Sequence, residues 1–355
     1  MFRIHGHGPT VSMLEHSLNG GHLHHAYLLV GPEHVGKTTL AVQLAQAVNC
    51  TGEGPPCLEC DACLRIAHAQ HADVLTLEVN PGQEGEGRKS IGIDTIRELQ
   101  HSASLRPYEG RKRVYIIQDA ERMSPEAANA LLKTLEEPPP DVMLVVLTSD
   151  IDSLLPTVIS RCMQLELRPL PIAEVTQLLQ DEYSVAAPEA EQFARLSRGC
   201  VGWAIQAVQD PEPAAALHQR LERIASVCEG DLDHRFSYAD DLARRFQRDR
   251  AAGREELYLW LRWWRDVLLI LQGQTDQVIH ITWQETLERL ASNVSPTEVV
   301  RWIHVITATL DALDQNANAR LALEVMMLEL PGVQVARAVV RLKTKSPSLW
   351  ASGSG

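Results

Sequence analysis

The segment GPEHVGKT, at residues 31–38, carries the residue types that bind a nucleotide phosphate. Gly31 and Gly36 lack a Cβ atom, so the backbone between them can approach phosphate oxygens closely. Lys37 supplies a positive charge, and Thr38 supplies a hydroxyl group for magnesium at the start of a helix. The residues predicted to bind ATP or ADP with magnesium are Gly31, Gly36, Lys37, Thr38 and Thr39.

Hydrolysis of a nucleotide also needs a strand-end acid that positions the metal and a second group that orients water. In RVYIIQDAERM, residues 113–123, the usual acid position is occupied by Gln118, a neutral amide that binds magnesium poorly. Asp119 follows, where a catalytic glutamate is expected. If the alignment is shifted by one residue, Asp119 becomes the metal acid and Ala120 replaces the base. Either alignment lacks one member, so the sequence predicts a nucleotide site with incomplete hydrolytic machinery.

Four cysteines at residues 50–63 form a second constellation, with the spacing C-x6-C-x2-C-x2-C. Four thiolates suit a closed tetrahedral zinc site, which has no open position and is therefore structural. An iron-sulfur cluster is the alternative, but the sequence offers no redox context for it. The predicted zinc ligands are Cys50, Cys57, Cys60 and Cys63.

Arg161 stands in an SRC sequence at residues 160–162, after the strand-rich part of the chain. An arginine there can cap a structural element, carry a solvated charge, or reach the phosphate of a nucleotide in a neighbouring subunit. The chemistry of the residues alone leaves these three readings open.

A basic stretch covers residues 88–113, which contain seven Lys or Arg residues and only three Asp or Glu residues. The stretch is either a solvated surface or a phosphate-contacting one. The whole chain of 355 residues has a formal charge of -13, which argues against nucleic-acid binding over its entire surface. No apolar run is long enough to span a membrane and no signal-peptide pattern is present, so the cytoplasm is the expected location.

The elements that position these residues alternate between strands and helices up to residue 166 and are helical afterwards. Apolar, β-branched segments at residues 26–31, 74–79, 113–118 and 142–148 predict strands, and helical periodicity lies between them. This alternation predicts a mostly parallel sheet covered on both faces. In the helical part, Leu257, Leu261, Trp264, Leu268 and Leu271 fall on one predicted face, which we expect to be core.

Several longer segments resemble the subunits of the bacterial replicative clamp loader of DNA polymerase III, an AAA+ family, and within it the delta prime family. They are HAYLLVGPEHVGKTTLA, the four-cysteine insertion, IGIDTIREL, ANALLKTLEEPP, TSDIDSLLPTVISRC and NANARLALEVMMLELP.

The resemblance implies an AAA+ module at residues 1–166 with a zinc insertion at 50–63. A helical lid at 167–210 and a C-terminal collar domain at 211–340 would follow, and the composition of residues 341–355 itself predicts a disordered tail. It also implies a hetero-pentamer with delta and gamma/tau subunits, which opens the sliding clamp and places it on primer-template DNA. In that assembly Arg161 would be an arginine finger acting in trans, and Thr148 would occupy the sensor position.

The departures from the gamma/tau motor subunits point in the same direction. Gln118 stands where their metal-binding Asp lies, and Gly202, in GCVGWA, stands where their lid carries a nucleotide-contacting Arg. The residues that would act on this chain's own nucleotide are incomplete, whereas Arg161, which would act on the nucleotide of a neighbouring subunit, is present. This combination resembles a delta prime stator within the polymerase holoenzyme. Such a chain would hold ATP or ADP and hydrolyse it poorly or not at all.

Two alternatives remain. The first is a self-sufficient gamma/tau-type AAA+ ATPase motor. The second is a zinc-containing nucleic-acid-binding module that uses the cysteines and the stretch at 88–113 as its contact surface.

Overall fold

The computed structural model describes residues 2–78 and 90–330. The predicted tail at 341–355, and Arg88 and Lys89 of the basic stretch, lie outside the described residues. The chain divides into two compact units, Met1–Gln209 and Asp210–Gly355. The predicted boundaries of the module, lid and collar stay a prediction. No helix in the described ranges combines the length and the apolar character needed to cross a membrane.

The first unit is built on a five-stranded parallel sheet with the order β2-β3-β4-β1-β5. The strands are β1 (Ala26–Val30), β2 (Val74–Leu77), β3 (Arg113–Ile117), β4 (Val142–Thr148) and β5 (Met163–Glu166). The helices around it are α1 (Gly8–Asn19), α2 (Lys37–Asn49), α3 (Asp61–Ala67), α4 (Ile93–Ala103), α5 (Pro125–Glu136) and α6 (Pro156–Ile159). The predicted fold class, a parallel α/β module followed by helices, is confirmed.

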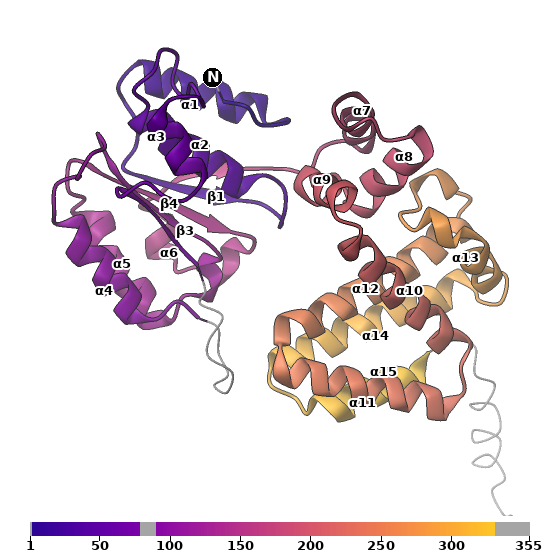
Figure 1. The fold of residues 1–355 in the computed structure, drawn as a ribbon. Helices are drawn as coiled ribbons and strands as arrows, with labels where there is room; N and C mark the ends of the chain where they lie inside the picture. The colour runs from indigo at the N-terminus through magenta and orange to yellow at the C-terminus, as the bar shows by residue number, and fades with distance from the viewer. Residues whose placement is uncertain (1, 79–89, 331–355) are drawn as a thin grey trace, which may run out of the picture. The chain divides into compact units, whose positions relative to one another are not determined.

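Alternate residues of each central strand enter cores on opposite faces of the sheet. Tyr27 and Leu29 of β1 pack in the core shared with α1 and α2, whereas Ala26 and Leu28 pack in the core shared with α4 and α5. Figure 1 shows α1, α2 and α3 on one side of the sheet and α4, α5 and α6 on the other. Because all strands are parallel, the residues that follow β1, β3 and β4 meet at one edge of the sheet.

Three helices complete the first unit: α7 (Ile172–Tyr183), α8 (Ala187–Leu196) and α9 (Val201–Gln209). They form a small core of their own, centred on Val175, Leu179, Ala190, Ala194 and Ala204.

The second unit is wholly helical in its described part. It contains α10 (Glu212–Glu229), α11 (Leu232–Arg248), α12 (Arg250–Leu271), α13 (Gln284–Ala291), α14 (Pro296–Asp314) and α15 (Ala319–Glu329). Trp260, Trp263 and Trp264 of α12 are completely buried, and they pack in one core with Trp302 of α14. The central helix of this unit is therefore buried over more of its circumference than a single face.

Candidate functional site

The phosphate-binding loop connects β1 to α2, as its sequence context predicts. Gly36 immediately precedes α2 and has a φ of 114°, a conformation that glycine adopts without strain. The Nζ atom of Lys37 donates hydrogen bonds to the carbonyl oxygens of Gly31 at 2.6 Å and Pro32 at 2.9 Å. The lysine thus folds back over the loop, and its ammonium group lies where a phosphate would bind at the start of α2.

A cavity of about 370 Å³ opens beside this loop. Its lining residues are Glu33, His34, Gly36, Lys37, Thr38, Thr39, Gln118, Asp119, Leu147 and Gly202. Burial lowers the pKa of Lys37, and the carboxylates of Glu121, Glu33 and Asp119 partly offset this effect. The cavity therefore pairs one cation with acidic walls, so an anionic phosphate fits it better with a magnesium ion.

Two polar residues at strand ends, Gln118 and Thr148, hydrogen-bond to acidic side chains of this chain. Gln118 lines the cavity, and its amide donates a hydrogen bond of 3.0 Å to Glu78. The buried hydroxyl of Thr148 donates a hydrogen bond of 2.8 Å to one carboxylate oxygen of Glu121, and the backbone N–H of Ser149 donates to the other. Thr148 is thus held by an internal acid rather than exposed in the cavity wall.

Helix α9 packs directly on the phosphate-binding loop. The backbone N–H of Gly202 donates a hydrogen bond of 2.8 Å to the carbonyl oxygen of His34. A Cβ atom added at Gly202 would lie 2.7 Å from that oxygen, closer than real Cβ contacts allow. A longer side chain at this position would therefore force α9 away from the loop.

Arg161 follows α6 and is not a lining residue of the cavity. Its Nη1 donates hydrogen bonds to the carbonyl oxygen of Thr157 at 2.9 Å and to Ser160 Oγ at 3.3 Å. Its Nη2 pairs with a carboxylate oxygen of Glu136 at 2.6 Å, and about a third of the side chain, 34%, is exposed. The guanidinium group is therefore anchored on one side and accessible on the other.

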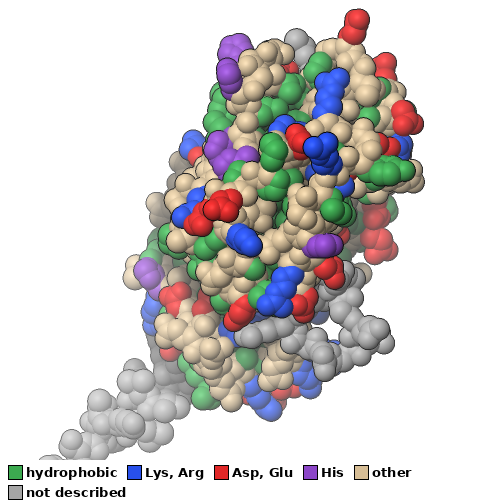
Figure 2. Space-filling view, turned by 90° about the vertical axis from the view of Figure 1, so that its left-hand side faces the viewer, with side chains coloured by type: hydrophobic (Ala, Val, Ile, Leu, Met, Phe, Trp, Pro, Cys, Tyr) green, Lys and Arg blue, Asp and Glu red, His purple; other side chains and the backbone are tan. Residues whose placement is uncertain are grey.

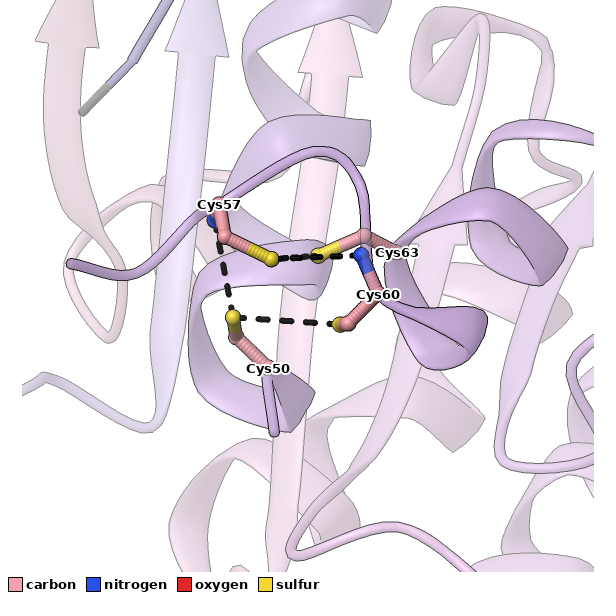
Figure 3. A group of neighbouring side chains, drawn as sticks. All are labelled: Cys50, Cys57, Cys60 and Cys63. Carbon is pink, nitrogen blue, oxygen red and sulfur yellow. Dashed lines mark hydrogen bonds between the residues drawn. The ribbon is translucent and has the colours of Figure 1, made fainter. Parts of the chain in front are cut away.

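The four cysteines converge on a common centre, as Figure 3 shows. Their sulfur atoms all lie within 4.8 Å of one another, and the pairs Cys50–Cys60 and Cys57–Cys63 are each separated by 4.0 Å. Zinc–sulfur bonds of about 2.3 Å require about 3.8 Å between the sulfurs of a tetrahedron. Backbone N–H groups of Cys57 and Cys60 point at sulfur atoms of the cluster, an arrangement that stabilises thiolates. The geometry is compatible with a structural zinc ion.

Purified without chelators, the chain should therefore contain about one zinc ion per molecule. Replacing Cys57 and Cys60 with serine should remove the metal, because the remaining two thiolates cannot close a tetrahedral site. Elemental analysis of both proteins measures this directly. Cys162→Ser is the matched control, since Cys162 lies outside the cluster and should leave the zinc content unchanged. A zinc content near zero in the unaltered protein would remove the metal assignment.

The described part of the basic stretch does not form one surface. Arg113 is buried and pairs with the completely buried Asp73 at 3.0 Å, so it fits neither the solvated nor the phosphate-contacting reading. Arg97 pairs with Asp94 on the surface, whereas Arg106 and Arg111 are exposed. Figure 2 shows one face of the molecule, on which Lys and Arg side chains are interspersed with Asp and Glu. Neither observation favours a nucleic-acid-binding module.

Sequence reasoning missed three residues near the phosphate-binding loop. Glu33 and His34 occupy the variable positions of the motif, and the motif gives them no role. Glu121 lies two residues beyond Asp119, but its partner Thr148 is 27 residues away along the chain. Only the pairing of β3 with β4 brings them together, so no local pattern could have found this contact.

Comparison with known proteins adds a consistent set of similarities. Residues 6–171 match the model of a family described as "DNA polymerase III, delta subunit". The chain is 29% identical to DNA polymerase III subunit delta prime of Bacillus subtilis, over 90% of this chain and 95% of that protein. It is 32% identical to the tau subunit of Escherichia coli over 64% of this chain, and it spans only about a third, 35%, of that longer protein. A solved gamma-subunit-related protein from Thermotoga maritima is 20% identical, with coverages of 90% and 97% and a TM-score of 0.46.

Proposed function

The chain belongs to the clamp-loader family of DNA polymerase III, and from this premise we propose that it is a delta prime type stator subunit. It would hold a nucleotide without hydrolysing it efficiently and would supply Arg161 to the active site of a neighbouring ATPase subunit. The observation that carries this proposal is the combination of an intact phosphate-binding loop with Gln118 at the metal-acid position.

The contacts of Gln118 support binding without turnover. An amide offers magnesium a single neutral oxygen, a weaker ligand than a carboxylate, and the amide nitrogen of Gln118 donates to Glu78. Asp119 remains in the cavity wall, but the residue after it, Ala120, has no group that could orient a water molecule. The site can thus neutralise phosphate charge, but it lacks one of the two acids that the reaction needs.

Gly202 supports the same conclusion from the other side of the cavity. With no side chain at this position, α9 contributes a backbone N–H to the loop and no charged group to a bound nucleotide. The close approach of the Gly202 and His34 backbones leaves no room at this position for a longer, charged side chain.

The proposed partners are delta and gamma/tau subunits in a hetero-pentamer that acts in the cytoplasm on the sliding clamp and primer-template DNA. Zinc would be structural, held by the four cysteines, and ATP or ADP with magnesium would occupy the cavity. Mixing the purified chain with delta and gamma/tau subunits and measuring the mass of the product tests the assembly. Failure to form a complex at micromolar concentrations would contradict the proposed role.

For the isolated chain, we expect ATP to bind and to remain uncleaved. Lys37→Ala should weaken ATP binding by about 10- to 100-fold, because one charge-assisted contact to phosphate is lost. Calorimetric titration measures the binding, and release of inorganic phosphate measures the turnover. Arg168→Ala is the control, since Arg168 pairs with Glu166 at the surface and does not line the cavity. Appreciable hydrolysis that disappears in Lys37→Ala would instead favour the gamma/tau-type motor.

A further inference from the structure

Glu136 is the one acidic side chain that the described structure pairs with Arg161. Glu136 is the last residue of α5, and its carboxylate accepts from Nη2 of Arg161 at 2.6 Å. The two residues are 25 positions apart in the sequence, and neither lines the nucleotide cavity. Their pairing therefore calls for an explanation separate from nucleotide binding in this chain.

Both ends of this ion pair are carried by rigid elements. Leu131 and Leu135 of α5 pack in one buried core with two residues near Arg161. These are Leu154, which precedes α6, and Val158, which is part of α6. The backbone N–H of Arg161 also donates to the carbonyl oxygen of Val158, so the residue leaves α6 in a fixed direction. The backbones of Glu136 and Arg161 are thus anchored by one core, which fixes the separation of the two Cα atoms.

The contacts of the guanidinium group define its plane and leave part of it available. Nη1 is bound to Thr157 and Ser160, and Nη2 is bound to Glu136. An arginine has five N–H donors, so Nε and one N–H of Nη2 remain for a further acceptor. The side chain is still 34% exposed. An arginine held in this way loses less rotamer freedom when it meets a phosphate.

The pair contributes little to the stability of the fold. Half of the Glu136 side chain, 50%, is exposed, and ion pairs between solvated groups stabilise proteins only weakly. Removing the charge of Glu136 should therefore change the orientation of Arg161 without unfolding the unit.

We propose that Glu136 is the positioning residue of Arg161, and that it orients the guanidinium group toward the phosphate of the nucleotide in the neighbouring subunit. This inference rests on the proposed function, because it requires Arg161 to act in trans. Glu136 itself would not contact the nucleotide. Its influence on the reaction passes through Arg161 alone.

The test uses the complex reconstituted with delta and gamma/tau subunits, and initial rates of ATP hydrolysis measured over a range of ATP concentrations in the presence of primed DNA. Glu136→Gln, which keeps the shape and removes the charge, should lower the hydrolysis rate at saturating ATP by about three- to tenfold. The KM for ATP should not change, because the neighbouring subunit's own loop binds the nucleotide. Glu137→Gln is the matched control, since Glu137 is the next residue, is exposed, and does not form the ion pair with Arg161.

A double-mutant cycle with Arg161→Ala separates orientation from a general structural effect. If Glu136 acts through Arg161, Glu136→Gln should cause no further loss in the Arg161→Ala protein, and both variants should unfold at the wild-type temperature. A loss from Arg161→Ala with an unchanged or raised rate in Glu136→Gln would overturn this inference and leave the stator proposal standing. An unchanged rate in Arg161→Ala would overturn both.

Discussion

Replacement of Arg161 with alanine should lower ATP turnover at the neighbouring site by a factor of about 10³ to 10⁵, the typical loss when an arginine finger is removed. The physical reason is that the planar guanidinium group stabilises charge on the transferring phosphoryl group only when it is positioned before the reaction begins. Contacts with Thr157, Ser160 and Glu136 within the same chain position Arg161. Single-turnover hydrolysis by the reconstituted complex measures the effect, because the affected site appears as a slow phase.

Two controls make this result specific to Arg161. Arg168→Ala removes an arginine that pairs with Glu166 in an exposed position, and it should leave the hydrolysis rate unchanged. Arg161→Lys keeps the positive charge and loses the two-pronged donor geometry, so it should recover only part of the rate. Assembly of the complex should persist in all three variants, because none of them alters a buried core. An unchanged rate in Arg161→Ala at saturating ATP and DNA would be incompatible with the proposed role.

Four of the five strands of the first unit could be predicted because each has a local apolar signal, whereas the short strand β5, Met163–Glu166, was missed. The apolar segments at residues 113–118 and 142–148 became β3 and β4 to within one residue, and the helix that follows the phosphate-binding loop begins at Lys37. The four cysteines were predictable as a cluster because their spacing is itself local. Turn and helix chemistry within 14 residues is enough to bring these four sulfur atoms together.

The contacts that decide how the site works join residues far apart in the chain. Thr148 meets Glu121, and Arg161 meets Glu136, only because the parallel sheet brings separate loops and helix ends together. The burial of Arg113 was missed for the same reason, since its partner Asp73 directly precedes β2, the strand that pairs with β3. In the second unit, the face of α12 that was predicted to be buried is narrower than the face that the structure buries. Trp260 and Trp263 lie outside that face and are completely buried, because helices surround α12 on several sides.

The buried carboxylate of Asp73 is expected to be the most sensitive single position for the stability of the first unit. It accepts hydrogen bonds from the backbone N–H groups of Tyr108, Glu109 and Gly110, at 2.7, 2.8 and 2.8 Å, and from the guanidinium group of Arg113. Asp73→Ala would leave a buried charge and three N–H groups without their acceptor. Breaking a buried pair in this way costs about 3–5 kcal/mol of unfolding free energy.

The same network predicts a dependence on pH. Burial alone would raise the pKa of Asp73, but the hydrogen bonds from the backbone and from Arg113 outweigh it and lower the pKa from 3.8 to about 2. Since the pKa is lower in the folded protein than in the unfolded chain, the carboxylate stabilises the fold fully above about pH 4. This stabilisation is lost as the pH falls from about 4 toward 2. Asp73→Asn should therefore be less stable than wild type at neutral pH and should lose less stability over that pH range.

Unfolding in urea, followed by two signals, can separate the two units. Of the seven tryptophans only Trp203 belongs to the first unit, and five of the other six, Trp260, Trp263, Trp264, Trp283 and Trp302, lie in the described part of the second unit. Tryptophan fluorescence therefore reports mainly on the second unit, whereas far-ultraviolet circular dichroism reports on both. Asp73→Ala should shift the part of the dichroism transition that belongs to the first unit and leave the fluorescence transition in place.

Asp94→Asn is the matched control for Asp73, because Asp94 also pairs with an arginine three positions along α4, but in an exposed position. Exposed pairs of this kind contribute at most about 1 kcal/mol, so this variant should unfold close to wild type. If Asp73→Ala and Asp94→Asn lost equally little stability, the loop at residues 104–112 would be held by contacts other than the carboxylate. A large loss of unfolding free energy confined to Asp73→Ala would instead identify that carboxylate as the group that holds this loop. The same loop also contacts the end of α2, where the side-chain oxygen of Asn49 accepts hydrogen bonds from the backbone N–H groups of Arg111 and Lys112. Asn49 directly precedes Cys50, the first cysteine of the cluster.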